Sequence, residues 1–267
     1  GRPQLEIWET RRLEDERRRL QDVGTCNDDG TSYFYAESVD RVFPSDRTSA
    51  ARSVSTNHCP NHAWTSLNGF KPLMKSTRYV FAGYPMLSTF DPIYLNREGA
   101  IGVLFSGAMV YSDYVNDDVG PATEYVKSAA YLLGDSFDEC GCLADSKTEP
   151  SYGCHIPPSC LLKQLGQTGE AHSPQIGWVI DGFPLYGPRG PNGQYMRSCN
   201  ATGGTIGVDV CLDECNGYYG TIPEDKYRYR YYSTGTYHEA NGDNACEAPP
   251  PKQRDAYFPF MPPCIKG

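Results

Sequence analysis

The chain has 267 residues, of which 39% are hydrophobic and 21% charged, and its formal net charge is −9. This length and composition suit one large globular domain or two small ones with a substantial core. The acidic charge disfavours nucleic acid as a partner, and no apolar run approaches the roughly 18 residues that span a bilayer. The 27 glycines and 21 prolines indicate many turns and few long helices.

The eleven cysteines are the strongest compositional signal. Their spacing is irregular and lacks the paired C-x2-C pattern of zinc ribbons, which favours disulfides formed in an oxidising compartment. An N-glycosylation sequon begins at Asn200 and fits secretion to the cell surface or the extracellular space. An odd count leaves one thiol that is free or bonded to another chain.

The first predicted element is a helix from Leu5 to Val23, within an N-terminal arm that covers residues 1–25. Trp8, Leu13 and Leu20 fall on one side of this helix. The arm is expected to pack on the domain or on a neighbouring subunit, and a solvated, frayed arm is the alternative.

The rest of the chain, residues 26–267, is predicted to be one domain of short antiparallel strands, arranged as a sandwich or an irregular sheet with long loops. In chain order, strands are expected at residues 32–35, 78–83, 101–105, 108–111, 176–180, 208–211 and 226–232. A short helix is expected at 122–133, and loops at 44–55 and at the cysteine-rich stretch 138–161. We find no repeat of fixed period.

Two histidines in the stretch 57–62 have metal-ligand spacing, since His58 and His62 are four residues apart. Pro60 lies between them and makes a helix unfavourable, which weakens this signal. A solvated loop is the favoured interpretation for His58.

The stretch 171–188 combines a buried strand with a rigid corner. Pro184 and Pro188 donate no backbone hydrogen bond, so the chain is not expected to continue in the centre of a sheet. His172 and Asp181 stand at the two ends of the strand. They form either a ligand site or a purely structural corner.

The stretch 226–232 alternates tyrosine and arginine with the period of a strand. Arg228 and Arg230 are expected on its outer face, where guanidinium and aromatic groups could bind a glycan or a carboxylate partner. The alternative is an edge strand that its arginines keep soluble.

Several blocks occur together in one order, and this order resembles the YHYH-domain family of secreted proteins from residue 57 to the C-terminus. The blocks are Pro60-Asn61-His62, Gly99-Ala100-Ile101-Gly102-Val103, Tyr152 to Leu161, His172 to Pro188, Leu212-Asp213-Glu214-Cys215-Asn216-Gly217 and Tyr257-Phe258-Pro259-Phe260. The resemblance implies a location outside the cytoplasm and a tendency to bind metal.

The departures from the family weaken the metal expectation. The naming motif, Tyr-His-Tyr-His, is Tyr152-Gly153-Cys154-His155 in this chain. A second motif of the family, Tyr-x-Tyr-His, is Tyr227-Arg228-Tyr229-Arg230 in this chain. Its arginines stay protonated and cannot ligate a metal. Only His62, His155 and His172 match histidines of the family.

The departures also imply a disulfide. Cys142 and Cys154 stand where the family lacks cysteine, and we expect them to bond to each other. The further expected pairs are Cys140–Cys160, Cys215–Cys264, Cys199–Cys211 and Cys26–Cys59. Cys246 is left over as a free thiol or an intermolecular link.

The sequence therefore predicts a secreted, non-catalytic structural or interaction protein that assembles with copies of itself or with other extracellular proteins, or contacts glycans. The alternative is a protein that binds copper or zinc through His62, His155, His172 and Asp181. A third hypothesis assigns the acidic pairs at residues 138–139 and 213–214 to carbohydrate binding or hydrolysis.

Overall fold

The computed structural model describes residues 25–28, 30, 34–39, 51–94, 99–115, 127–133, 136–144, 151–235 and 259–267. Over these residues the protein is mainly β, which confirms the predicted fold class. The predicted N-terminal helix, with Trp8, Leu13 and Leu20, lies outside them, and so does Cys246. In the described ranges no helix is long and apolar enough to cross a membrane.

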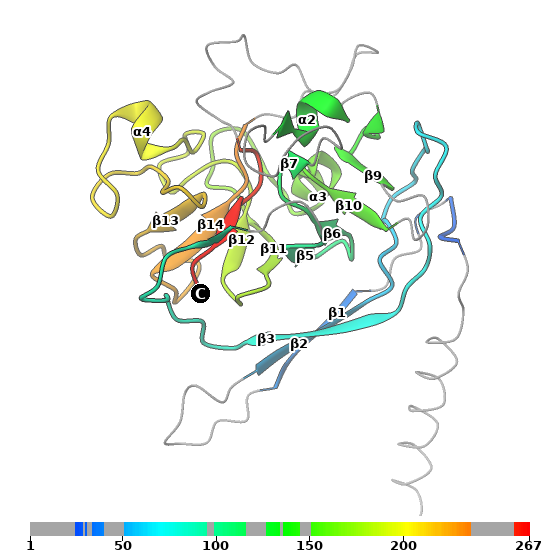
Figure 1. Ribbon diagram of the computed structural model, residues 1–267, viewed down its shortest axis with the longest axis horizontal. Coiled ribbons are helices and arrows are strands. Elements are labelled where there is room, and N and C mark those ends of the chain that lie inside the picture. The colour runs from blue at the N-terminus through cyan, green and yellow to red at the C-terminus, as the bar shows by residue number, and fades with distance from the viewer. Residues whose placement is uncertain are drawn as a thin grey trace, which may run out of the picture.

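The elements are short and are joined by long loops (Figure 1). The strands are β1 (Phe34–Val39), β2 (Ala51–Thr56), β3 (Thr77–Ala82), β4 (Ile93–Tyr94), β5 (Gly102–Leu104), β6 (Met109–Val110), β7 (Tyr114–Val115), β8 (Lys127–Ser128), β9 (Cys142–Ala144), β10 (Tyr152–Cys154), β11 (Gln175–Val179), β12 (Pro184–Tyr186), β13 (Gly217–Tyr219), β14 (Tyr229–Tyr232) and β15 (Cys264–Ile265). The helices are α2 (Ala129–Leu132), α3 (Ser159–Gln164) and α4 (Cys199–Thr202).

The largest sheet has eight strands within the described residues, in the order β13-β14-β12-β11-β5-β6-β10-β9. This order reads the same from either edge when β5 is matched with β11, β6 with β12, β9 with β13 and β10 with β14. The pairings match as well, because β6–β10 and β12–β14 are parallel and the others are antiparallel. The sheet therefore consists of two equivalent four-stranded units related by an approximate twofold axis, a duplication that the sequence analysis missed.

The axis passes between β5 and β11, where Val103 lies opposite Trp178. Gly102 and Gly177 occupy equivalent places in the two units. A Cβ atom on Gly102 would lie 2.4 Å from the carbonyl oxygen of Trp178, and one on Gly177 would lie 2.3 Å from that of Val103. Both positions therefore require glycine for the two units to approach each other.

The units also share a turn. Asp138 and Asp213 each begin a five-residue turn, before β9 and β13, whose fourth residue is in the left-handed region with φ of 80° and 61°. Each carboxylate accepts hydrogen bonds from the backbone N–H groups two and four residues further on. It also accepts one from a tyrosine hydroxyl, that of Tyr152 in the first unit and Tyr229 in the second.

The sheet β1–β2–β3 lies below the large sheet in the view of Figure 1, and its Val54 and Phe81 cluster with Val103 and Met109 of the large sheet. From β2, the Thr56 hydroxyl donates to the carbonyl of Gly107 at 2.6 Å, and the Arg52 guanidinium donates to that of Gly182 at 3.4 Å. Gly107 and Gly182 stand at equivalent hairpin turns of the two units, with φ of 88° and 91°. The small sheet therefore bridges both units.

Several predicted boundaries were wrong. Pro184 does begin a strand inside the sheet, because the first residue of a strand can do without its N–H. Residues 51–55, assigned to a loop, belong to β2, and the cysteine-rich stretch 138–161 contains the hairpin β9–β10. Residues 208–211 form turns rather than a strand.

Candidate functional site

His155 is buried in the first unit, with a relative exposure of 5%. Its Nδ1 lies 2.7 Å from the carbonyl oxygen of Ser112, and its ring stacks on Tyr111 with centroids 5.2 Å apart. Phe137 packs beside it at 6.3 Å. These contacts make His155 a core residue.

His172 belongs to the second unit and has different partners. Its ring stacks on Tyr186 at 5.2 Å, and its Nε2 lies 2.9 Å from the Tyr232 hydroxyl. Its Nδ1 lies 3.4 Å from a carboxylate oxygen of Glu224.

Asp181 closes the corner that follows β11. Its Oδ2 accepts hydrogen bonds from the Tyr231 hydroxyl at 2.6 Å and from the Gly267 N–H at 3.1 Å, and its Oδ1 accepts from the Phe183 N–H. Burial raises the pKa of this carboxyl. The carboxylate anchors the corner to β14 and to the end of the chain, as the structural interpretation of this corner expected.

His62 lies in the loop after β2. Its Nε2 is 2.8 Å from the Tyr152 hydroxyl and 3.7 Å from a carboxylate oxygen of Asp138, and its Nδ1 is 3.2 Å from Asn61 Oδ1. None of these partners is shared with His155, His172 or Asp181.

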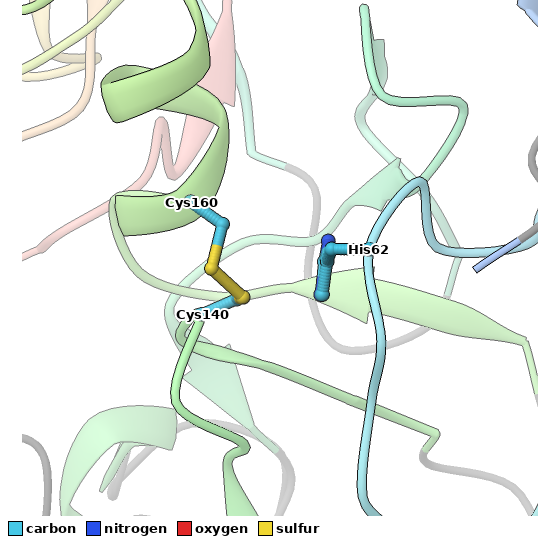
Figure 2. A group of neighbouring side chains, drawn as sticks. All are labelled: His62, Cys140 and Cys160. Atoms are coloured by element: carbon cyan, nitrogen blue, oxygen red, sulfur yellow. A yellow bond between two sulfur atoms is a disulfide. The ribbon is translucent and has the colours of Figure 1, made fainter. Parts of the chain in front are cut away.

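The structure therefore does not assemble the predicted ligand set of His62, His155, His172 and Asp181. Among the described residues, one group of three metal-ligating side chains has its donor atoms within 4.8 Å of one another, and it consists of His62, Cys140 and Cys160 (Figure 2). Both of these cysteines are engaged in a disulfide, which leaves no thiolate to hold an ion.

The expectation of a solvated His58 was wrong. His58 is 4% exposed, and its Nε2 lies 3.2 Å from the Tyr79 hydroxyl. Burial, with a smaller effect of Lys75, lowers its pKa to about 4.

Acidification is expected to destabilise the protein through His155. Burial lowers the pKa of its ring to about 4 from 6.5, so the neutral ring is favoured in the folded protein. The stabilisation is complete above pH 6.5 and is lost as the pH falls towards 4, with a total on the order of 3 kcal/mol. The variant His155→Phe keeps an aromatic ring on Tyr111 and removes the titration. Its free energy of unfolding, from urea denaturation at several pH values, should fall less over this window.

The variant also loses the contact with Ser112, which lowers its stability at every pH. The test therefore compares the slopes of the free energy of unfolding against pH and not the absolute values. Asp181 and Asp213 have raised pKa values that act in the opposite direction, but both proteins contain them. The two curves should be parallel above pH 7. Equal slopes between pH 6.5 and 4 would contradict the assignment.

Arg230, predicted to face a partner, is fully buried, and this prediction was wrong. Its strand β14 lies inside the sheet, between β13 and β12, with all four residues buried. The guanidinium donates two hydrogen bonds to Asp225, at 3.0 and 2.9 Å, and a third to the Gly220 carbonyl. Arg230 is therefore part of the core.

Arg228 is exposed, as predicted, and lines a groove with a volume of about 410 Å³. The other groove residues include Tyr84, Leu87, Lys226 and Tyr227. The Lys226 ammonium lies over the Tyr84 ring, 4.2 Å from its centroid. The groove thus offers two cations and aromatic surface to a ligand.

Five disulfides join the described cysteines, in the pairs that the sequence analysis expected. They are Cys26–Cys59, Cys140–Cys160, Cys142–Cys154, Cys199–Cys211 and Cys215–Cys264. The sequon residue Asn200 is exposed on α4.

Two features besides the duplication escaped the sequence analysis. The acids Asp138 and Asp213 are buried turn residues, and the repeated Asp-Glu-Cys triplet was the available signal for their equivalence. The other feature is an exposed apolar run in residues 86–94, where no periodic pattern marks a surface. Its members are Met86, Leu87, Phe90, Ile93 and Tyr94, with exposures of 70%, 37%, 85%, 59% and 52%.

The comparisons with known proteins found no relative of this chain. No family model, no curated protein and no solved structure matches the chain. The resemblance to YHYH domains stays a prediction.

Proposed function

We propose that this chain is a secreted structural or interaction protein that assembles with copies of itself outside the cell. Five disulfides among the described residues support an oxidising compartment, because thiols are kept reduced in the cytosol. The exposed Asn200 sequon is accessible to the glycosylation machinery of the secretory pathway.

The observation that carries the assembly proposal is the exposed apolar run at residues 86–94. Five large apolar side chains within nine residues are exposed by between 37% and 85%. Clustered apolar surface of this kind is typical of interaction sites on soluble proteins. Phe90, at 85%, is the most exposed of the five.

The groove beside this run supports a second copy as the partner. Leu87 belongs to both features, and Lys226 and Arg228 place positive charge there. A copy of the same chain has 33 acidic residues against 24 basic ones, and this excess supplies carboxylates that can pair with the two cations of the groove. Aromatic and arginine side chains are also the types enriched at protein interfaces.

The experiment is light scattering coupled to size exclusion, with the intact chain and the variant Phe90→Asp. We expect the wild-type protein to form an oligomer and the variant to be monomeric, because the new carboxylate would have to be buried unpaired in the interface. The matched control is Val208→Asp, which charges an apolar side chain that is 79% exposed in another loop. It should oligomerise like the wild type.

A wild-type protein that stays monomeric at its highest soluble concentration would contradict the proposal. Equal dissociation by Phe90→Asp and Val208→Asp would assign the effect to net charge and contradict the proposed surface. The variant Arg228→Glu gives an independent measure of the groove, and its oligomer should dissociate at lower salt than that of the wild type.

A further inference from the structure

His62 stands beside one particular disulfide. Its imidazole and the sulfur atoms of Cys140 and Cys160 lie within 4.8 Å of one another (Figure 2). They come from the loop after β2, the turn before β9 and helix α3. None of the other four described disulfides has a histidine or carboxylate so close to both sulfurs.

The same disulfide also contains the least buried of the bonded cysteines. Nine of the ten bonded cysteines in the described residues are at most 3% exposed. Cys160 is the tenth and is half-buried. Because Cys140 is 1% exposed, Cys160 is the residue at which we expect an incoming thiol to attack.

The imidazole is held in place by hydrogen-bonding partners. Its Nε2 lies 2.8 Å from the Tyr152 hydroxyl, which in turn donates to Asp138. Asn61 contacts Nδ1. The His62 side chain is 14% exposed, so water can exchange protons with the ring.

The second unit supplies a natural comparison at the equivalent place. Lys266 there contacts the turn acid Asp213 at 3.0 Å, and the equivalent disulfide is Cys215–Cys264, with both cysteines fully buried. An imidazole both holds and releases a proton in the physiological pH range, whereas an ammonium group stays charged. The first unit therefore departs from the second in its proton-transfer capacity and in the access to its disulfide.

We propose that Cys140–Cys160 is an exchange-active disulfide that oxidises dithiols, with His62 as its proton-transfer group. A substrate thiolate attacks Cys160 Sγ, a mixed disulfide forms, and the bond to Cys140 breaks. The electron pair goes to Cys140 Sγ, and protonated His62 gives its proton to that sulfur.

The second substrate thiolate then attacks the first substrate sulfur of the mixed disulfide. The substrate disulfide forms, and Cys160 leaves as a thiolate that takes a proton from water. In total the dithiol loses two electrons and the protein disulfide gains them. The substrate class is an accessible dithiol, either a small molecule or a protein.

The test uses the folded 267-residue chain and dithiothreitol as the dithiol. Timed samples are alkylated and mapped, so that the reduction rate of each disulfide is measured separately. We expect Cys140–Cys160 to be reduced at least tenfold faster than Cys215–Cys264, which acts as the internal control. The variant His62→Gln should slow reduction of Cys140–Cys160 about tenfold and leave the control disulfide unchanged, since general acid catalysis contributes this much or more.

The direction of the change separates the proposal from a structural role. If His62 only stabilised the loop, its replacement would loosen the site and speed reduction. Faster or unchanged reduction of Cys140–Cys160 in His62→Gln would therefore overturn the proposal, and so would equal rates for the two disulfides in the wild type. In urea-unfolded protein the difference between the disulfides should disappear.

Discussion

Replacing Asp225 by alanine is expected to destabilise the protein by about 3–5 kcal/mol, because a buried guanidinium would lose its counter-ion. Arg230 is fully buried and forms its ion pair with this carboxylate at 2.9 Å. Asp225 also accepts a hydrogen bond from the Tyr186 hydroxyl at 2.9 Å. The measurement is urea denaturation without reductant, followed by tyrosine and tryptophan fluorescence.

The matched control is Arg228→Ala, two residues before Arg230 and exposed. Because Arg228 lines the proposed assembly groove, all variants are compared in the monomeric Phe90→Asp background, where loss of assembly does not contribute. Its free energy of unfolding should stay within about 0.5 kcal/mol of the wild-type value, as for most surface substitutions. A double replacement of Asp225 and Arg230 by apolar residues should cost less than Asp225→Ala, since it leaves no uncompensated charge. Equal stability losses in Asp225→Ala and Arg228→Ala would contradict the burial of the pair.

Replacing either turn acid by alanine should have an effect of similar size. In Asp213→Ala, two buried backbone N–H groups and the Tyr229 hydroxyl lose their acceptor. Each buried donor without a partner costs about 1–3 kcal/mol, so we expect a loss of at least about 3 kcal/mol. Asp138→Ala removes the same three bonds in the first unit and should cost a similar amount.

The control for this pair is asparagine at each position. Its side-chain carbonyl can still accept from the two backbone N–H groups, so Asp138→Asn and Asp213→Asn should cost less than half of the alanine values. Urea denaturation of all four variants measures the effects. Alanine variants that differ by more than about 2 kcal/mol would show that the two turns are not energetically equivalent.

The local elements were predictable where the pattern depends on local chemistry. The glycine at 107 and the apolar residues around it predicted the hairpin β5–β6, and the hydrophobic run before Asp181 predicted β11. The pair Cys142–Cys154 followed from the two cysteines that depart from the family pattern, and the other four expected pairs are also present. None of these required knowledge of the whole fold.

The position of each side chain relative to the rest of the fold was not predictable in the same way. Alternation in residues 226–232 correctly indicated a strand, but it does not tell an edge strand from an inner strand covered on both faces. Arg230 was therefore placed outside, although Asp225, five residues earlier, neutralises it in the core. The histidines matched a motif in sequence, yet His155 and His172 lie in different units with separate partners.

The duplication stayed hidden because the two units share few residue types and differ in the lengths of their loops. Their common features are conformational: a left-handed turn residue, a buried acid that caps the turn, and glycines where two backbones meet. Such features depend on pairing partners that are distant in the chain.

Because the strand order is palindromic, a polypeptide of half the length would be enough to encode this sheet. A half-length polypeptide that held a single unit would leave its innermost strand uncovered, and the partner that fits this strand is the same strand of another molecule. Two identical short chains could therefore build the whole eight-stranded layer as a homodimer, and fusion of their genes would free one subunit's catalytic or binding groups to diverge from the other's.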